Sequence, residues 1–257
     1  MTTIHEAATL LERSLRTRRD ILGRTRTGVS RDALQRLSAP ATASPAPAPG
    51  IAPDSLGAIE ETVRACRLCA HLAASRTHTV FGTGNPRAEL MFVGEAPGAD
   101  EDRAGEPFVG RAGELLTKII AAMGLSRSDV YIANVLKCRP DMPPGSSGNR
   151  PPESSEMANC LPYLRRQIAA IRPRVLVALG KTAMAGLTGA DEPMGAMRGR
   201  WFEFENIPLL PTYHPSYLLR NGSNAEKRKV WEDMMLVMEK LGMPISAKQR
   251  GFFLSAN

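Results

Sequence analysis

Residues 89–98, ELMFVGEAPG, carry the clearest structural signal in the chain. A short apolar run that ends in glycine-punctuated sequence is typical of a buried strand followed by a loop at its carboxyl end. Three later runs have the same apolar character and predict further strands at 130–135, 175–179 and 207–213. These four runs define the expected sheet.

Apolar residues recur at helical spacing between these runs. The spacing predicts helices over 115–123 and 157–171, a short helix from Lys181 and an amphipathic helix over 225–241, with Pro162 marking a kink or a boundary. Strands that alternate with helices predict a parallel sheet covered on both faces. The expected fold class is therefore α/β, a three-layer α/β/α sandwich with a central, mostly parallel four-stranded sheet, plus an N-terminal helical extension.

Composition divides the chain into four parts. Residues 1–37 have apolar residues at helical spacing and eight Arg against four acidic residues, which predicts a basic helical extension with an unidentified protein partner. Residues 38–53 predict an extended Pro/Ala-rich linker, and the compact domain is expected over 54–245. Residues 246–257 form a tail. Its segment 249–254 faintly resembles a sliding-clamp peptide, although a frayed terminus or packing on an edge is the favoured expectation.

The 257-residue chain is 43% hydrophobic and 23% charged, as is usual for globular proteins. No apolar run approaches the roughly 18 residues of a membrane-spanning helix. Arginines between Arg13 and Arg19 replace the apolar stretch of a secretory signal, so we expect a cytoplasmic protein with no membrane partner. A net charge of +7 favours a polyanionic partner.

Four cysteines are present, at Cys66, Cys69, Cys138 and Cys160. The first two form a C-x2-C pair, a spacing that lets two thiolates reach one metal centre. Structural zinc sites more often show two such pairs, so one pair with two separated cysteines favours an iron–sulfur cluster. The spacing alone does not name the metal, and unconnected thiols remain the alternative.

Ligands of parallel α/β sheets bind at the carboxyl ends of the strands. This rule selects 94–102, 134–139, 180–182 and 214–220 as the loops around a site. The first loop contains four carboxylates within eight residues, so a metal-dependent nuclease is one alternative. The sequence GKT at 180–182 is not a P-loop, because the first glycine of that motif is missing.

Three polar or aromatic residues near these strand ends stand out. His214 is followed by Pro and Ser, and Asn134 interrupts an apolar strand, where a buried amide is costly unless it is satisfied. Phe108 lies in a glycine-rich loop, where packing and stacking roles remain equally open. The proline-rich loop 139–152 and Lys137 predict a basic ridge suited to phosphates.

The order of these motifs resembles the family 4 uracil-DNA glycosylases, the iron–sulfur type of bacteria and archaea. The resemblance spans about 63–241. It is carried by the C-x2-C pair, GEAPGADEDRAGEPFVGRAGELL at 94–116, NVLKCRP at 134–140, NRPP at 149–152, Cys160, ALG at 178–180 and HPSYLL at 214–219. Two features depart from the family pattern: the extension at 1–53 and a loop at 141–148 that is longer than usual.

The resemblance implies a small parallel sheet between helical layers and a [4Fe–4S] cluster held by Cys66, Cys69, Cys138 and Cys160. Because glycosidic hydrolysis transfers no electron, the cluster is expected to be structural. The partner is then DNA containing uracil, single- or double-stranded.

Roles in base recognition follow from the same resemblance. Phe108 would stack on the flipped uracil, and the Asn134 amide would donate to O4 and accept from N3–H. Glu101 would crowd the C5 position and exclude thymine. Gly94 and Ala96 would flank the pocket.

The chemical step implies further roles. His214 would donate to O2 of the uracil anion as it leaves. Glu95 is the candidate that positions the attacking water and stabilises the cationic sugar, with Asp100 as the second choice. Arg220 and the loop between Lys137 and Arg150 would hold phosphates, and Leu218 or Leu219 would wedge into the gap left by the base.

The leading hypothesis is therefore a monofunctional uracil-DNA glycosylase of base excision repair, which leaves an abasic site. A non-catalytic iron–sulfur protein that binds DNA and recruits partners is the first alternative. A carboxylate-metal nuclease is the second, and it would need Mg²⁺ and cut the backbone directly.

Overall fold

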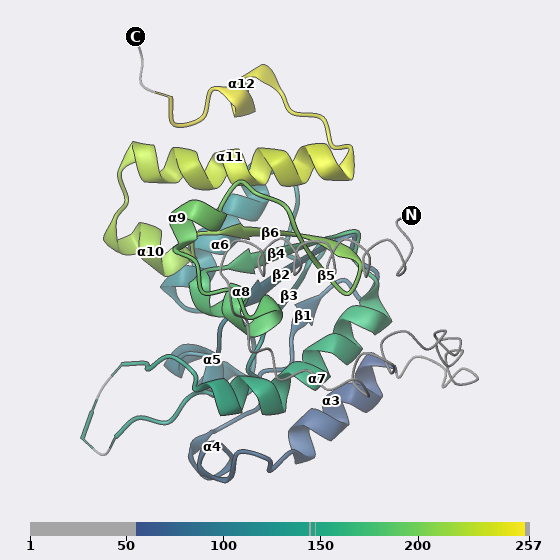
Figure 1. Ribbon diagram of the computed structural model, residues 1–257, viewed down its shortest axis with the longest axis vertical. Helices are drawn as coiled ribbons and strands as arrows, with labels where there is room; N and C mark the ends of the chain where they lie inside the picture. The colour runs from purple at the N-terminus through teal and green to yellow at the C-terminus, as the bar shows by residue number, and fades with distance from the viewer. Residues whose placement is uncertain (1–54, 144, 147, 255–257) are drawn as a thin grey trace, which may run out of the picture. The chain divides into compact units, whose positions relative to one another are not determined.

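The structure is a computed structural model that describes residues 55–143, 145–146 and 148–254 (Figure 1). The basic extension predicted over 1–37 and the linker predicted over 38–53 lie outside the described residues.

A six-stranded sheet forms the centre of the described domain, in the order β1-β3-β2-β4-β6-β5. The central strands β3, β2, β4 and β6 pair in parallel, which confirms the four predicted strands. The edge strands β1 and β5 pair antiparallel and have only two and three residues, too few for a periodic signal. The strands are β1 Thr83–Gly84, β2 Leu90–Gly94, β3 Tyr131–Asn134, β4 Val175–Leu179, β5 Phe202–Phe204 and β6 Ile207–Thr212.

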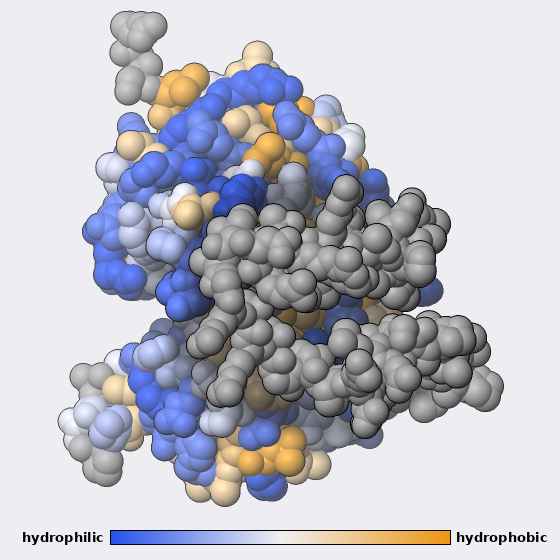
Figure 2. Space-filling model, in the orientation of Figure 1, coloured by the Kyte–Doolittle hydropathy of each residue, from blue (hydrophilic) through white to orange (hydrophobic). Residues whose placement is uncertain are grey.

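Helices connect the strands and cover the sheet (Figure 1). Among the described residues, no helix combines the length and apolar character needed to cross a membrane. On the face drawn in Figure 2, hydrophilic residues predominate among the coloured atoms, and hydrophobic ones form only small patches. The helices are α3 Leu56–Ala65, α4 Ala70–Ser75, α5 Ala99–Ala104, α6 Arg111–Ala122, α7 Ser154–Ile171, α8 Lys181–Thr188, α9 Met194–Met197, α10 Pro215–Arg220, α11 Asn224–Leu241 and α12 Ala247–Arg250.

The core has two halves, one on each face of the sheet. Successive residues of a strand point to opposite faces, so Met91 packs with α7 and α8 while Phe92 packs with α6 and α11. Neither side chain is exposed to solvent, and truncating Phe92 to Ala would cost about 3–5 kcal/mol. Helix α3 contacts α7 on its outer side. The predicted three-layer α/β/α architecture is confirmed.

Helix α7 continues through Pro162, so of the two expected effects of this proline, a kink or a boundary, the boundary is wrong. Proline leaves the carbonyl four residues earlier without its helical hydrogen bond. Pro162 lies on the exposed side of α7, where water can satisfy that carbonyl. The buried side of the helix supplies the apolar contacts that keep it intact.

The carboxyl-terminal segment packs back on α11 and α6. Trp231 donates its indole N–H to the carbonyl of Gln249 at 2.6 Å, and the Gln249 side chain donates to the carbonyl of Ala122 at 2.9 Å. The Phe252 ring lies 5.2 Å from that of Trp231. Packing of this segment is thus observed, and Gln249, the first residue of the segment compared with a clamp peptide, is hydrogen-bonded within the chain.

Candidate active site

A cavity of about 530 Å³ opens at the carboxyl ends of the parallel strands. All four loops selected from the sequence contribute to it, as expected for a parallel α/β sheet. Its walls also include the segment 149–151, which precedes α7. The lining residues are Glu95, Ala96, Pro97, Gly98, Glu101, Phe108, Ala112, Asn134, Asn149, Arg150, Pro151, Gly180, Lys181, His214, Ser216 and Arg220.

Asn134, the last residue of β3, lines this cavity and is only 2% exposed. Its Oδ1 is buried and has no hydrogen-bond partner among the described residues. An unsatisfied buried acceptor costs about 1–3 kcal/mol. Gly94, the neighbouring strand end, makes room for the amide: a Cβ on Gly94 would lie 2.3 Å from Asn134 Oδ1. Gly94 itself is buried beside the cavity.

Phe108 lines the cavity from the loop before α6, with its ring centroid 5.7 Å from that of His214. Its backbone is left-handed, with φ of 55°, a conformation that costs a bulky L-residue about 1–2 kcal/mol. Arg127 stabilises this loop by donating to the carbonyls of Phe108 and Pro107, at 3.2 and 2.9 Å. The hydrogen bonds from Arg127 to the backbone of this loop therefore fix the position of the Phe108 ring.

His214 lies between β6 and α10. Its Nδ1 accepts a hydrogen bond from the backbone N–H of Ser216 at 3.1 Å. Burial lowers the pKa of His214 to about 4, and the positive charge of Arg220 acts in the same direction. The imidazole is thus neutral at pH 7, and because Nδ1 is an acceptor, its proton resides on Nε2. The cavity contains a neutral N–H donor at this position.

Glu95 and Ala96 follow β2 and line the cavity. Burial raises the pKa of Glu95, and a hydrogen bond with Thr182 partly opposes the shift. The carbonyl of Glu95 accepts from the N–H of Leu136 at 3.0 Å, which continues the parallel pairing beyond the end of β3. The backbone that carries this carboxylate is therefore held beside the end of β3 by the sheet itself.

Glu101 lines the cavity and also joins two loops. Its Oε1 accepts from the backbone N–H groups of Val109 and Gly110, and its Oε2 accepts from that of Gly98, each at 3.1 Å. These bonds tie the start of α5 to the loop that carries Phe108. No pattern in the sequence predicts this bracing role.

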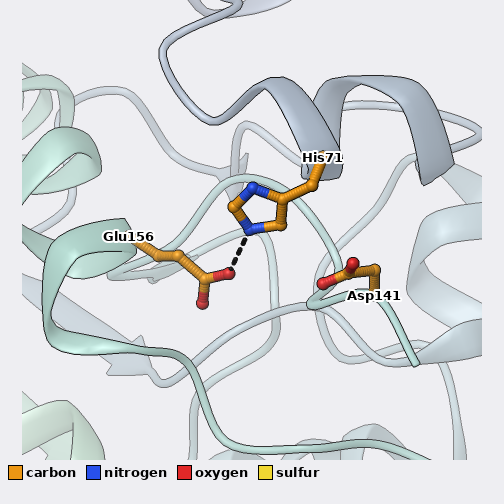
Figure 3. Close-up of side chains that lie close together, drawn as sticks. All are labelled: His71, Asp141 and Glu156. Carbon is orange, nitrogen blue, oxygen red and sulfur yellow. Dashed lines mark hydrogen bonds and ion pairs between the residues drawn. The ribbon is translucent and has the colours of Figure 1, made fainter. Parts of the chain in front are cut away.

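The remaining carboxylates of this segment point elsewhere. Asp100 is exposed, pairs with Arg103 and does not line the cavity. Asp102 is buried and accepts from the backbone N–H groups of Thr77 and His78. Among the described carboxylates, the ones grouped closely enough with other ligand atoms to hold a single metal ion are Asp141 and Glu156, together with His71, and they lie outside this segment (Figure 3). The metal site that the nuclease alternative requires at 95–102 is therefore not formed.

Two side chains of α10 are candidates for contact with DNA. Arg220 is exposed at the end of the helix and lines the cavity. Leu219 is 42% exposed, whereas Leu218 is buried in the domain. Of the two leucines considered as a wedge, Leu219 is the one that solvent can reach.

The expectation that Lys137 contacts phosphate is wrong. Its side chain is 1% exposed, and Nζ donates to the carbonyls of Asn134 and Phe81 at 2.8 and 3.1 Å. Burial lowers the pKa of Lys137 to about 8. Its ammonium group therefore braces the turn after β3 from inside the domain.

The four cysteines are brought together from four segments. Cys66 follows α3, Cys69 precedes α4, Cys138 follows β3 and Cys160 lies in α7. None of them forms a disulfide. Burial raises the pKa of Cys138 and raises that of Cys160 to about 12, and the neighbouring thiols add to both shifts. The cysteines thus share one site.

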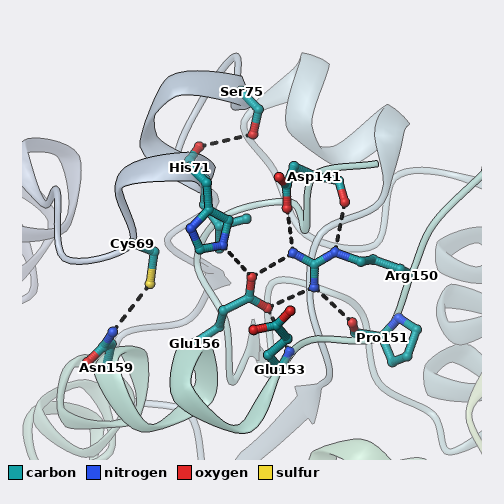
Figure 4. A network of polar contacts seen from close by, with 10 residues as sticks. Cys69, His71, Ser75, Asp141, Arg150, Pro151, Glu153, Glu156 and Asn159 are labelled. Atoms are coloured by element: carbon teal, nitrogen blue, oxygen red, sulfur yellow. Dashed lines mark hydrogen bonds and ion pairs between the residues drawn. The ribbon is translucent and has the colours of Figure 1, made fainter. Parts of the chain in front are cut away.

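The surroundings of these thiols fit thiolates bound to a metal centre. The guanidinium of Arg76 donates to Cys138 Sγ at 3.1 Å, and the backbone N–H of Lys137 donates to Cys160 Sγ at 3.2 Å. The Asn159 amide lies 3.6 Å from Cys69 Sγ (Figure 4). Hydrogen bonds of this kind to sulfur, together with the positive charges of Arg76 beside Cys138 and of Lys137 beside Cys160, stabilise the anionic thiolate ligands of a cluster.

Part of the cavity wall is not predicted from the sequence. Asn149, Arg150 and Pro151 line it, although the sequence indicates only phosphate binding for their loop. Ala112 and Ser216 also line it. The motif NRPP at 149–152 is a usable signal, since two prolines in succession restrict the backbone of a wall segment.

Comparison with known proteins agrees with this arrangement. The uracil DNA glycosylase superfamily matches the chain over residues 81–235, which include every residue that lines the cavity. The chain belongs to the uracil DNA glycosylase superfamily. The superfamily match starts after Cys66 and Cys69, so half of the cysteine site lies outside it.

Individual relatives refine the placement within the superfamily. The type-4 uracil-DNA glycosylase of Thermotoga maritima is 44% identical over 180 residues, which cover 68% of this chain and 89% of the relative. That of Saccharolobus solfataricus is 44% identical over 197 residues, covering 73% and 87%. A type-5 enzyme of Pyrobaculum aerophilum is 33% identical over 153 residues, covering 52% and 64%. The chain is therefore most similar to the type-4 branch among these relatives.

Proposed function

We propose that this chain is a monofunctional DNA-repair glycosylase that releases uracil from DNA by hydrolysis and leaves an abasic site. The observation that carries the proposal is the cavity at the strand ends, where a neutral N–H donor, an unpaired amide oxygen and an aromatic ring meet. Its volume of about 530 Å³ lies within the range of small-molecule sites, about 300–1,000 Å³.

Asn134 supplies base selectivity. Uracil presents an N–H donor at N3 and an acceptor at O4, so the unpaired Oδ1 of Asn134 accepts from N3–H while its NH₂ group donates to O4. Cytosine presents the opposite pattern and leaves each group of the amide unpaired, at about 1–3 kcal/mol per group. Phe108 stacks on the flipped base, and the braced Glu101 carboxylate excludes the methyl group of thymine.

His214 and Glu95 act in bond cleavage. The base leaves as an anion, and the N–H at Nε2 of neutral His214 donates to O2 as negative charge develops there. Glu95 positions the attacking water and stabilises positive charge on the sugar. Asp100 lies outside the cavity, which favours Glu95 over it for this role.

Cys66, Cys69, Cys138 and Cys160 would hold a [4Fe–4S] cluster, in keeping with their common site and the N–H donors around their sulfur atoms. When bound, the cluster cross-links four segments of the chain. Hydrolysis of the glycosidic bond transfers no electron, so its role is structural.

The natural partner in this proposal is uracil-containing DNA in the cytoplasm, associated with the nucleoid. Arg220 contacts a phosphate beside the flipped nucleotide, and the exposed Leu219 enters the gap left by the base. The basic segment 1–37 binds a protein partner that is not identified. Flipping the target nucleotide out of the base stack costs a few kcal/mol, and it costs least in a single strand. Because this cost is small even in a duplex, both single- and double-stranded DNA are substrates in this proposal.

Base release from a uracil-containing oligonucleotide in EDTA tests the proposal, with thymine- and cytosine-containing strands as controls. We expect strand cleavage only at uracil and only after alkali treatment. Cleavage that requires Mg²⁺ and no alkali would support the nuclease instead. Binding of the oligonucleotide without base release by folded, brown protein would support the recruitment protein.

A further inference from the structure

A second cavity, of about 420 Å³, lies between α6, α10, α11 and the carboxyl-terminal segment. Most of the residues that line it are apolar, and we call it the tail groove because Phe253 forms part of its wall. Helices α6 and α10 contribute to both cavities: Arg220 lines the first, and the preceding Leu219 lines the tail groove. A DNA strand that leaves the first cavity past Arg220 would meet the tail groove next.

Phe253 presents an aromatic ring at this groove. The residue is 41% exposed, and its backbone is left-handed, with φ of 62°. Arg228 of α11 fixes the turn that carries it, because its guanidinium donates to the carbonyls of Arg250 and Phe252 at 2.7 and 2.9 Å. The ring is therefore held in a defined place and still open to solvent. Nucleic-acid bases stack on aromatic rings of this kind.

Two lysines give the tail groove a positive charge. Lys118 of α6 and Lys227 of α11 line it, and neither forms an ion pair or a side-chain hydrogen bond with any described residue. Among the described residues that line the groove there is no carboxylate. An aromatic, apolar surface with unpaired ammonium groups fits both parts of a nucleotide, the base and the phosphate. An apolar protein segment would cover the surface but leave both charges without a partner.

We propose that the tail groove binds the uracil-containing strand beside the flipped nucleotide, with a flanking base stacked on Phe253 and neighbouring phosphates paired with Lys118 and Lys227. The inference rests on the proposed glycosylase function. In this arrangement the strand passes from the first cavity across Leu219 to Phe253. Stacking on an aromatic ring depends little on which base it is, so the groove adds affinity without adding sequence preference.

The test uses two single-stranded oligonucleotides of equal length with one central uracil. The first has ordinary bases on both sides, and in the second abasic analogues replace every base except the uracil, so the phosphates are the same but no flanking base can stack. In the full-length, cluster-loaded protein, we expect Phe253→Ala to raise KM about tenfold on the first oligonucleotide, with kcat unchanged. On the second oligonucleotide its KM should equal that of the wild type. Phe253→Trp should keep the wild-type KM on both.

The two lysines should act equally on both oligonucleotides, because both carry the same phosphates. Binding is followed by fluorescence anisotropy in the Glu95→Gln background, which slows release of the base. Lys118→Gln and Lys227→Gln should each reduce the dependence of log Kd on log salt concentration by about 0.7, the value for one phosphate contact on a single strand.

Trp201 and Lys240 provide matched controls. Trp201 is 37% exposed, Lys240 Nζ lies 5.4 Å from the centroid of its ring, and neither residue lines a cavity described above. Lys240 lies near the opposite end of α11 from Lys227, about 20 Å away along the helix. Trp201→Ala should therefore leave KM unchanged, and Lys240→Gln should leave the salt dependence unchanged.

Two results would overturn the proposal. A KM unchanged by Phe253→Ala on the first oligonucleotide would mean that the groove binds no base and would favour a protein partner instead. An equal rise in KM on both oligonucleotides would mean that the substitution disturbs the domain and removes no stacking. If the wild-type protein released no uracil, the proposed function would fail, whereas anisotropy with the same two oligonucleotides would still decide whether a base stacks on Phe253.

Discussion

Replacing Gly94 with Ala adds one methyl group beside the cavity. The new Cβ would lie 2.3 Å from Asn134 Oδ1 and 2.6 Å from Phe108 Cζ, and real Cβ atoms essentially never approach other atoms within 3.0 Å. Asn134 is buried, and Arg127 holds the backbone of Phe108 in its left-handed conformation. Both neighbours must therefore shift, and both line the cavity in which we propose that the base binds.

The rate should suffer more than the stability. Overpacking of this kind costs about 1–3 kcal/mol, which for a domain of this size lowers Tm by roughly 2–12 °C. A displacement of about 1 Å in the groups that position the substrate costs on the order of 100-fold in rate. We expect single-turnover release of uracil by Gly94→Ala to fall about 100-fold while thermal unfolding, followed by circular dichroism, remains cooperative.

Gly57→Ala provides the matched control. Gly57 lies in α3, and a methyl group on its Cα would have no atom within 4 Å, so the same chemical change meets no neighbour. Gly57 is the second residue of α3, and alanine is the better helix former, so stability should be unchanged or slightly higher and the rate unaltered. A Gly94→Ala rate within threefold of wild type would refute the argument that this close approach fixes the pocket.

Three further predictions concern the same site. The rate should fall as pH is lowered through the raised pKa of Glu95, because the carboxylate is the active form, while His214 stays neutral down to about pH 4. The test is the single-turnover pH profile of Glu95→Gln, which should have a low rate and should no longer show this fall at acidic pH. Cys138→Ala should lose brown colour and thermal stability together, and a stable, active, colourless variant would contradict the cluster assignment. Arg220→Ala should reduce the salt dependence of DNA binding by about one phosphate contact, whereas Lys137→Met should lower Tm without changing that dependence.

The central strands could be predicted because a strand that is buried on both faces of a sheet needs apolar residues at successive positions, and this gives a continuous apolar run in the sequence. All residues of β2 and β4 are buried, and both runs are visible without the structure. The edge strands could not be predicted in the same way. Thr83–Gly84 and Phe202–Phe204 are set by pairing with a neighbour in space, and nothing local in two or three residues specifies that partner.

The site was predictable where a polar residue interrupts a strand end, as Asn134 and His214 do. The site was not predictable where a charged side chain is buried because its hydrogen-bond partners lie far away in the sequence. Lys137 faces inward because the carbonyls of Asn134 and Phe81 satisfy its ammonium group, and Phe81 lies 56 residues away in sequence. Charge patterning treats such a lysine as exposed, since a buried lysine is rare without partners.

Several destabilising features are concentrated around one end of the sheet. Phe108 holds a left-handed backbone, Asn134 keeps an unpaired oxygen, and Lys137 buries a charge directly behind it. In the free protein the unpaired oxygen lowers stability by about 1–3 kcal/mol, and N3–H of a bound uracil is the group that would restore its hydrogen bond. Cytosine has no hydrogen at N3, so its entry would leave the oxygen unpaired and recover none of that free energy. In the proposed function, the unsatisfied atom that destabilises the empty site would therefore also be the physical source of selectivity for uracil over cytosine.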